Sequence, residues 1–350
     1  MELNFDNSFA KELKDFYEFT KADKSTSPKL IKFNESLAKK LGPEWEKLKS
    51  DNGLLIFSGN EVPKGSQPLS QAYSGHQFGG FSPLLGDGRA ILLGEVIDKD
   101  NIRKDIQLKG SGRTIFSRGG DGKSSLGPVL REYLISEAMH SLNIPTTRAL
   151  AAVSSGDDVF REKALPGGIL TRVASSHIRV GTFQYASTTG DIEKIRVLSD
   201  YSINRHYKKL LQKKEKYIEF FESVCESQIN LISKWMGIGF IHGVMNTDNM
   251  TISGETIDYG PCAFMNSYDP KTVFSSIDKM GRYAYCNQPV ITKWNLSRFA
   301  ECLLPLIDKD QEKAIKIAWE GYSMANDYLC NIKDHFINTV IIHYQPRIHP

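Results

Sequence analysis

The chain has 350 residues, of which 40% are hydrophobic and 24% are charged, and its formal net charge is +3. This composition excludes a disordered chain, and the length suffices for one large or two medium domains with a buried core. The small net charge argues against the concentrated basic face of a nucleic-acid-binding protein, and no apolar run has the length of a membrane span.

The beginning of the chain and its cysteines predict a cytoplasmic location. Residues 1–6 include two acidic side chains and lack the basic region and apolar core of a signal peptide. The five cysteines are odd in number, widely spaced and without a Cys-x-x-Cys pair, which argues against a zinc site or a secreted disulfide framework. We therefore expect reduced thiols, and partners that are neither nucleic acids nor membranes.

The first expected element is an N-terminal helical extension over residues 1–50, which are polar and lysine-rich with scattered apolar positions. A region rich in Gly, Ser and Pro follows, from 59 to 88. Two strands are expected next. At 90–96 an apolar run is bounded by turn residues, and at 105–109 polar and apolar residues alternate.

A glycine-rich stretch, 110–124, leads into an amphipathic pattern that predicts a helix over 125–142. Two more strands are expected near 148–153 and 168–174. The second half of the chain reads as mostly helical, most clearly over 214–236. The order of these elements predicts an α+β protein whose strands lie mainly in its first half.

The most informative stretch is His242 to Asn249, followed by Asp258-Tyr259-Gly260. In the protein-kinase catalytic loop, H-R-D-x-x-x-x-N, the His and Asn have this spacing, and a D-F-G triplet follows. Here Val244 stands where a kinase has its catalytic Asp. The metal-binding positions are kept and the usual base is lost. The chain therefore either binds nucleotide without kinase chemistry or uses the metal for another transfer.

Asn249 and Asp258 are predicted to hold Mg²⁺ or Mn²⁺, because hard oxygen donors on adjacent loops suit ions that bridge phosphates. The alternative is a turn cap and an ordinary loop carboxylate, which the co-occurrence of both motifs disfavours. Asp248 is the nearest carboxylate that could replace the absent base. For this residue, a surface turn is the alternative.

Lys109 ends a predicted strand, and Glu132 lies on the next predicted helix. In kinases such a glutamate orients a strand lysine toward phosphate. Taken singly, an exposed lysine and a solvated glutamate would be the better interpretation. Their order relative to the downstream motif favours the pair.

Two other groups of residues suit phosphate less specifically. Gly86 and Gly88 allow backbone N–H groups to approach phosphate, and Arg89 adds charge, although Gly-Asp-Gly is also a common hairpin turn. Arg172 and Arg179 are seven positions apart, which would align them on one face of a helix over two turns. Surface salt bridges explain that arginine spacing equally well.

Three further patterns are less telling. Residues 119–124 look like a P-loop, but Ser117 occupies its first required glycine position. The basic stretch 205–216 reads as a solvated helix face, and His76, without a second metal-type residue nearby, is expected to be structural. Two strands are expected to flank 253–255.

From about residue 73 to residue 306, the chain resembles the selenoprotein O family, also known as YdiU proteins. Many motifs in one order are more specific than any single motif. They are Gly75-His76-Gln77-Phe78-Gly79, Leu85-Gly86-Asp87-Gly88-Arg89, Gln107-Leu108-Lys109-Gly110, Arg131-Glu132, Arg172, Ser176 to Gly181, His242 to Asn249, and Asp258 to Cys262.

This resemblance implies a two-lobed protein-kinase-like fold, once called a pseudokinase. A β-rich N-lobe over 51–180 would carry the nucleotide-binding glycine-rich loop, and a helical C-lobe over 181–350 would carry the catalytic and metal-binding loops. The family transfers AMP from ATP to protein hydroxyl groups, with ATP flipped relative to kinases. The flip gives a reason for Val244, because a different phosphorus is attacked from a different side.

The resemblance also implies the roles of individual residues. Asp248 would be the catalytic proton acceptor, Glu132 would orient Lys109, and Asn249 and Asp258 would hold the metal. The residues implied to contact ATP are Gly86, Gly88, Arg89, Lys109, Asp121, Gly122, Arg172, Arg179 and Asp258.

The expected function is metal-dependent protein adenylyltransfer (AMPylation) from ATP to Ser, Thr or Tyr hydroxyls, including its own. Uridylyltransfer with Mn²⁺ stays open, because these residues do not reveal base selectivity. A non-catalytic nucleotide-binding pseudokinase scaffold is a second possibility, against which the intact metal ligands count. A phosphotransferase is a third, and Val244 counts against it.

Overall fold

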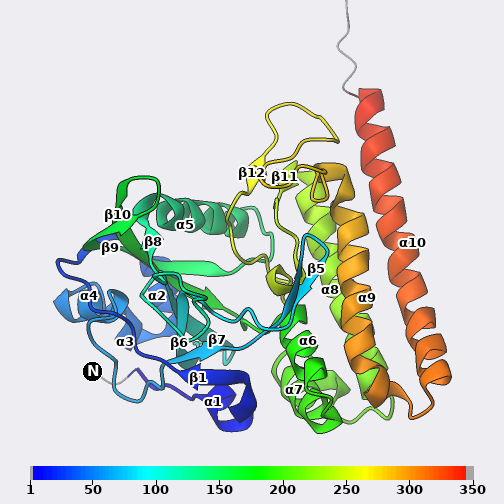
Figure 1. Ribbon diagram of the computed structural model, residues 1–350, viewed down its shortest axis with the longest axis horizontal. Helices are drawn as coiled ribbons and strands as arrows, with labels where there is room; N and C mark the ends of the chain where they lie inside the picture. The colour runs from blue at the N-terminus through cyan, green and yellow to red at the C-terminus, as the bar shows by residue number, and fades with distance from the viewer. Residues whose placement is uncertain (1–2, 344–350) are drawn as a thin grey trace, which may run out of the picture.

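The computed structural model describes residues 3–343, and it places their side chains except those of 324–326 and 333–343. The molecule has two parts (Figure 1). A β-rich part is built from residues up to about 174, and helices dominate the part from Val180 onward. The predicted two-lobed α+β architecture is therefore confirmed. Among the described residues, no helix is long and apolar enough to cross a bilayer.

The main sheet runs in the order β1-β3-β6-β7-β10-β9-β2, with β8 paired to β10, and all its pairs are antiparallel. Its strands are β1 (Tyr17–Phe19), β2 (Lys29–Phe33), β3 (Leu69–Gln71), β6 (Ala90–Ile97), β7 (Arg103–Lys109), β8 (Ser124–Ser125), β9 (Arg148–Phe160) and β10 (Ala164–Ala174). The strands predicted at 90–96 and 105–109 are confirmed. Those predicted at 148–153 and 168–174 are parts of a longer hairpin.

Residues 1–50 are more than the helical extension that we predicted. They do contain α1 (Ser8–Glu12), η1 (Lys14–Phe16), α2 (Glu35–Leu41) and α3 (Pro43–Glu46), and α4 (Asp51–Phe57) follows. They also supply β1 and β2, the two outer strands of the sheet. Short polar strands of this kind depend on a partner edge for their hydrogen bonds, so local sequence predicts them poorly.

Two layers of helices flank the sheet. The predicted helix 125–142 is confirmed as α5 (Leu126–Ser141), which packs through Val129 and Tyr133 onto β9 and β10. Helices α2, α3 and α4 enclose a separate apolar cluster with β6, β7, β9 and β10. A small hairpin, β4 (Gly75–Gln77) and β5 (Gly80–Ser82), stands apart from the main sheet.

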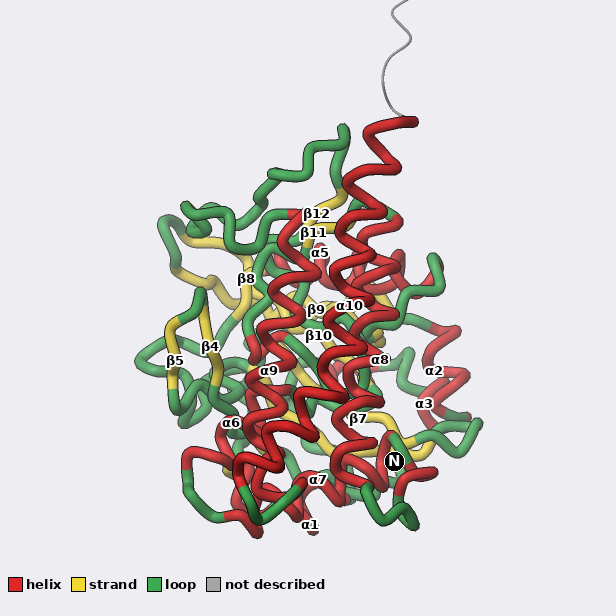
Figure 2. The backbone as a smooth tube through the Cα atoms, turned by 90° about the vertical axis from the view of Figure 1, so that its right-hand side faces the viewer, coloured by secondary structure: helices red, strands yellow, loops and turns green. Residues whose placement is uncertain are grey.

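The helical part comprises α6 (Val180–Thr188), α7 (Ile192–His206), η2 (Lys208–Leu210), α8 (Lys216–Gly237), η3 (Thr247–Asn249), η4 (Tyr285–Asn287), α9 (Gln288–Ile307) and α10 (Gln311–His343), with the short pair β11 (Phe240–Ile241) and β12 (Ala263–Phe264). Figure 2 shows α9 and α10 side by side, and both contact α8. The helix predicted over 214–236 is confirmed as α8. The strands predicted around 253–255 are wrong, because Thr251 and Thr256 make isolated bridges to different segments.

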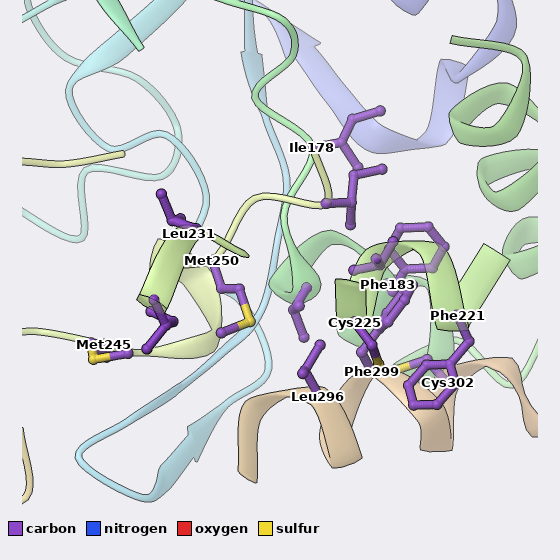
Figure 3. Packing of buried hydrophobic residues seen from close by; sticks show 14 of the residues in the cluster. Ile178, Phe183, Phe221, Cys225, Leu231, Met245, Met250, Leu296, Phe299 and Cys302 are labelled. Atoms are coloured by element: carbon purple, nitrogen blue, oxygen red, sulfur yellow. The ribbon is translucent and has the colours of Figure 1, made fainter. Parts of the chain in front are cut away.

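The largest apolar cluster lies mainly in the helical part, extends to α1, β3, β6 and α5, and supports the segment that carries the kinase-like motif. Met245 and Met250, on either side of η3, both belong to this cluster. Figure 3 shows them near Leu231 of α8, at one end of the labelled residues. Their burial fixes the backbone between them, so the polar side chains of η3 are held by a rigid core.

Candidate active site

One cavity of about 590 Å³ collects the predicted site residues from distant parts of the chain. Its lining includes Gly86, Gly88, Arg89, Lys109, Asp121, Gly122, Glu132, Arg172, Arg179, Asp248, Asn249 and Asp258. Val244, at the position of the kinase base, lines it too. A cavity of this size with many polar groups suits a ligand as large as a nucleotide. The roles predicted for the individual residues remain predictions.

Lys109 and Glu132 meet inside the molecule. Lys109 is the last residue of β7, Glu132 lies on α5, and the distance from Nζ to Oε2 is 2.6 Å. Both residues are buried. The Lys109 ammonium also donates to Oδ1 of Asp258. Two carboxylates therefore fix the position of this ammonium at the cavity wall.

Arg172 and Arg179 do not share a helix face as their spacing suggested. Arg172 lies on β10, and Arg179 is the N-cap residue of α6. The strand ends between them, so only the tertiary fold brings them to one cavity. Nη1 of Arg172 donates to Asp258 Oδ1 at 2.7 Å and lies 3.3 Å from Glu132 Oε1. The guanidinium of Arg179 lies over the Tyr73 ring at 4.2 Å.

Asp258 is the centre of a charged cluster. Its φ of 62° lies in the left-handed region, which Asp tolerates better than most residues. Burial alone would raise the pKa of Asp258. The charges of Lys109, Arg172 and Arg179 outweigh burial and hold that pKa well below its ordinary value. The carboxylate is therefore ionised.

Asp248, ten residues earlier, has a different environment. It is only 7% exposed, and its Oδ2 accepts a hydrogen bond from Gln77 Nε2 at 3.2 Å. Its Oδ1 has no partner among the described residues. Burial raises the pKa of Asp248 to about 6, although Gln77 and the charge of Arg179 oppose the rise. A buried carboxylate with a free oxygen and a raised pKa is suited to accept a proton.

The loop geometry separates structural residues from those available to a ligand. His242 is buried, its Nε2 lies 2.8 Å from the carbonyl oxygen of Ile257, and its ring stacks on Trp235. It therefore holds the two loops together. Asn249 Nδ2 donates to the Val244 carbonyl at 2.9 Å, so its amide oxygen takes no part in that bond.

The donor set fits a Mg²⁺-type ion. Asn249 and Asp258 offer oxygen ligands at one cavity, and the described residues contain no group of three or more His, Cys, Asp or Glu that could hold a metal. Mg²⁺ is usually bound by one or two protein oxygens, with phosphate and water completing its shell.

Gly86 and Gly122 are required by backbone conformation and close packing, independently of any phosphate. Gly86 has φ of 63°, and a Cβ on it would lie 2.2 Å from the Phe116 ring. Gly122 has φ of 66°, and a Cβ on it would lie 2.0 Å from the Gly112 carbonyl oxygen. Larger residues at these two positions would collide with Phe116 and Gly112 of the glycine-rich loop.

Sequence reasoning missed several lining residues. Asp87 is buried and accepts from Gln107 Nε2 at 3.1 Å, although in this segment we assigned roles only to its neighbours Gly86, Gly88 and Arg89. Arg161, in the β9–β10 turn, pairs with Asp121 at 2.8 Å. No local pattern marks Arg161, because the hairpin alone brings it to the glycine-rich loop. Cys262 is buried with its pKa raised to about 11 by burial, which disfavours redox reactivity.

Comparisons with known proteins agree with these motifs. A family model described as "Protein adenylyltransferase SelO" matches residues 1–344. The chain is 60% identical over 315 residues to "Protein nucleotidyltransferase YdiU" of Cereibacter sphaeroides strain ATCC 17029, covering 90% of this chain and 65% of the relative. Proteins of the same name from Rhizobium rhizogenes strain K84 and Shouchella clausii strain KSM-K16 are 60% and 58% identical, over 90% of this chain and 63% and 65% of theirs.

The chain thus spans slightly less than two thirds of these relatives' length. Among solved structures, a Toxoplasma gondii specific rhoptry antigen kinase domain overlaps 83% of this chain and 92% of its own, at 7% identity and a TM-score of 0.31. A structural similarity this low supports no conclusion about individual residues. The family model matches nearly the whole chain, and the relatives are about 60% identical to it. The chain therefore belongs to the SelO family of protein nucleotidyltransferases.

Proposed function

We propose that this chain carries the active site of a metal-dependent protein adenylyltransferase, which transfers AMP from ATP to Ser, Thr or Tyr hydroxyls. The names of the family model and of the relatives support nucleotidyl transfer in general. The more specific proposal rests on one observation. Two carboxylates with opposite electrostatic environments, Asp248 and Asp258, line the same cavity, where Val244 replaces the kinase base.

The cationic side of the cavity suits a triphosphate. Lys109, Arg172 and Arg179 are all buried there, and their mutual repulsion is offset by Asp258 and Glu132. Phosphate oxygens could take over some of these contacts, since guanidinium and ammonium groups bind phosphate and carboxylate alike. When bound, a divalent ion held by Asn249 and Asp258 would neutralise further phosphate charge.

Asp248 is the proposed proton acceptor. The acceptor hydroxyl gives its proton to the carboxylate of Asp248, which lines the cavity. The hydroxyl oxygen then bonds to the α-phosphorus. The bond from that phosphorus to the oxygen bridging the β-phosphate breaks, and pyrophosphate leaves. Positioning and charge neutralisation contribute most of the acceleration in such transfers.

Transfer of isotopic label tests this proposal. The protein is incubated with Mg²⁺ or Mn²⁺ and ATP labelled at the α- or the γ-phosphate, and its intact mass is measured. We expect self-modification by α-label with the mass gain of one AMP. Transfer of γ-label would instead make the protein a phosphotransferase. ATP binding without transfer of either label, to itself or to added proteins, would favour the scaffold.

A parallel incubation tests nucleotide choice. UTP with Mn²⁺ replaces ATP, and the mass gain distinguishes UMP from AMP. Faster modification by UTP would replace adenylyltransfer with uridylyltransfer at the same site. The Asp248→Asn protein is the control in both experiments, because it keeps the shape of the side chain and removes the proton acceptor.

A further inference from the structure

The guanidinium of Arg172 is held from behind by two side chains. Its Nε donates to His177 Nε2 at 3.2 Å and to Gln107 Oε1 at 3.2 Å, and its Nη2 donates to Gln107 Oε1 at 2.6 Å. The remaining nitrogen, Nη1, contacts the carboxylates of Asp258 and Glu132. Arg172 is 2% exposed. The orientation of its cavity-facing nitrogen is therefore set by the contacts on its opposite edge.

His177 is itself fixed by a buried carboxylate. Asp105 Oδ2 accepts from the His177 backbone N–H at 2.9 Å and lies 2.8 Å from ring Nδ1. The other oxygen, Oδ1, accepts from Arg205, whose Nε donates to the Ser175 carbonyl at 2.9 Å. Arg205 belongs to the stretch that we interpreted as a solvated helix face. Its side chain is only 2% exposed, because it turns inward to Asp105.

The proton positions follow from which groups can donate. Arginine only donates, so His177 Nε2 must accept from Arg172. Burial would raise the pKa of Asp105, but Arg205 and His177 outweigh it and keep the carboxylate ionised, so His177 Nδ1 carries the proton. Burial lowers the pKa of His177 to about 4, and the ring is neutral at neutral pH. The two neighbours thus impose one tautomer.

We propose that His177 is a positioning residue for the nucleotide site. Asp105 fixes the Nδ1–H tautomer of its ring, and Nε2 then orients the Arg172 guanidinium so that Nη1 faces the cavity. His177 is not among the residues that line the cavity. The orienting contact is a property of the folded chain, whereas its consequence for ATP rests on the proposed function.

The tautomer is tested without ATP or catalysis. Nitrogen-15 NMR of histidine-labelled protein at pH 7 distinguishes a protonated ring nitrogen from an unprotonated one, and ring-to-backbone correlations assign the signals of His177. We expect a neutral ring with the proton on Nδ1. A proton on Nε2, or on both nitrogens, would overturn the inference, since Nε2 could then not accept from Arg172.

ATP binding tests the consequence of this contact. Calorimetry compares the wild type with His177→Leu, which removes the acceptor, and His177→Gln, whose amide oxygen can replace Nε2. Because the Arg172 guanidinium loses the acceptor that orients it, we expect His177→Leu to weaken ATP binding about tenfold and His177→Gln to recover most of the affinity. Equal affinities in all three would overturn the positioning role.

His206→Leu is the matched control. His206 is another imidazole whose pKa burial lowers, to about 3, but its ring nitrogen lies 2.8 Å from Ser176 Oγ and does not contact Arg172. This variant should bind ATP like the wild type. A similar loss in both His→Leu variants would indicate general destabilisation and overturn the specific role. A wild type that binds no ATP would refute the proposed function, and the tautomer would still decide whether His177 can orient Arg172.

Discussion

Asp258 and Asp248 lie ten residues apart and line one cavity, yet their environments have opposite effects. Around Asp258, three cationic side chains outweigh burial and keep the carboxylate ionised. Around Asp248, burial prevails and raises the pKa to about 6. Two carboxylates of one site whose pKa values are shifted in opposite directions generally have different roles. The pair teaches that the counter-charges around a carboxylate decide whether its pKa falls or rises within one cavity.

The largest effect is expected from removing the charge of Asp258. Asp258→Asn keeps a residue that tolerates the left-handed backbone, whereas Ala would add strain at φ of 62°. Loss of a metal ligand and of the counter-charge to Lys109 and Arg172 should slow α-label transfer about a thousandfold or more. Thermal melting checks that the variant is folded. Retained transfer in a folded variant would remove Asp258 from the metal site.

The next largest effect concerns Asp248. In Asp248→Asn the amide cannot accept the hydroxyl proton, and loss of a general base typically slows a reaction about 10²–10⁴-fold. ATP affinity, measured by calorimetry, should stay within about twofold, since the hydrogen bond to the Asp248 side chain comes from Gln77 and not from the cations that would hold phosphate. Asp269→Asn, on an exposed loop, is the control. A large loss of ATP affinity would make Asp248 a ligand-binding residue like Asp258.

A smaller effect is expected at His177, where burial lowers the pKa of the ring although the neighbouring Asp105 carboxylate opposes this. Its pKa is about 4 in the folded protein and about 6.5 when unfolded, so the unfolded chain binds more protons between these values. The stability that this group contributes is complete above pH 6.5 and falls as the pH drops toward 4, by on the order of 2 kcal/mol at pH 5.

Urea unfolding at pH 7 and pH 5 measures this effect. Other groups also titrate, so His177→Gln provides the reference. The difference in unfolding free energy between wild type and variant should shrink at the lower pH, because the variant has no ring to protonate. An unchanged difference would contradict a depressed pKa for His177.

The smallest effect is expected at the exposed rim of the cavity. Arg161 pairs with Asp121 at 2.8 Å, but their side chains are 47% and 37% exposed. Exposed ion pairs contribute about 0–1 kcal/mol, so Arg161→Ala should change melting and ATP affinity only slightly. A tenfold loss of ATP affinity would instead give Arg161 a direct contact with the nucleotide, and the rim would then resemble the buried cluster.

Much of the fold could be predicted, because long periodic segments such as α5 and α8 carry their own signal. The outer strands β1 and β2 could not, since their hydrogen bonds depend on β3 and β9. At the site, the order of Lys109, Glu132 and the catalytic loop predicted the pair that the structure brings to 2.6 Å. The strand predicted over 168–174 does contain Arg172, and of the two interpretations left open for the arginine spacing the shared helix face is wrong, because β10 ends between Arg172 and Arg179.

The sequence by itself determined which family the chain belongs to and which chemical groups it carries, since motifs record residue types in order. The tertiary structure alone decided what those groups experience. It surrounded Asp258 with cationic side chains and buried Asp248 with one oxygen that has no partner among the described residues, and it turned Arg205 inward to hold Asp105 behind His177. Desolvation and charge pairing depend on neighbours distant in the chain, so they follow only from the folded protein.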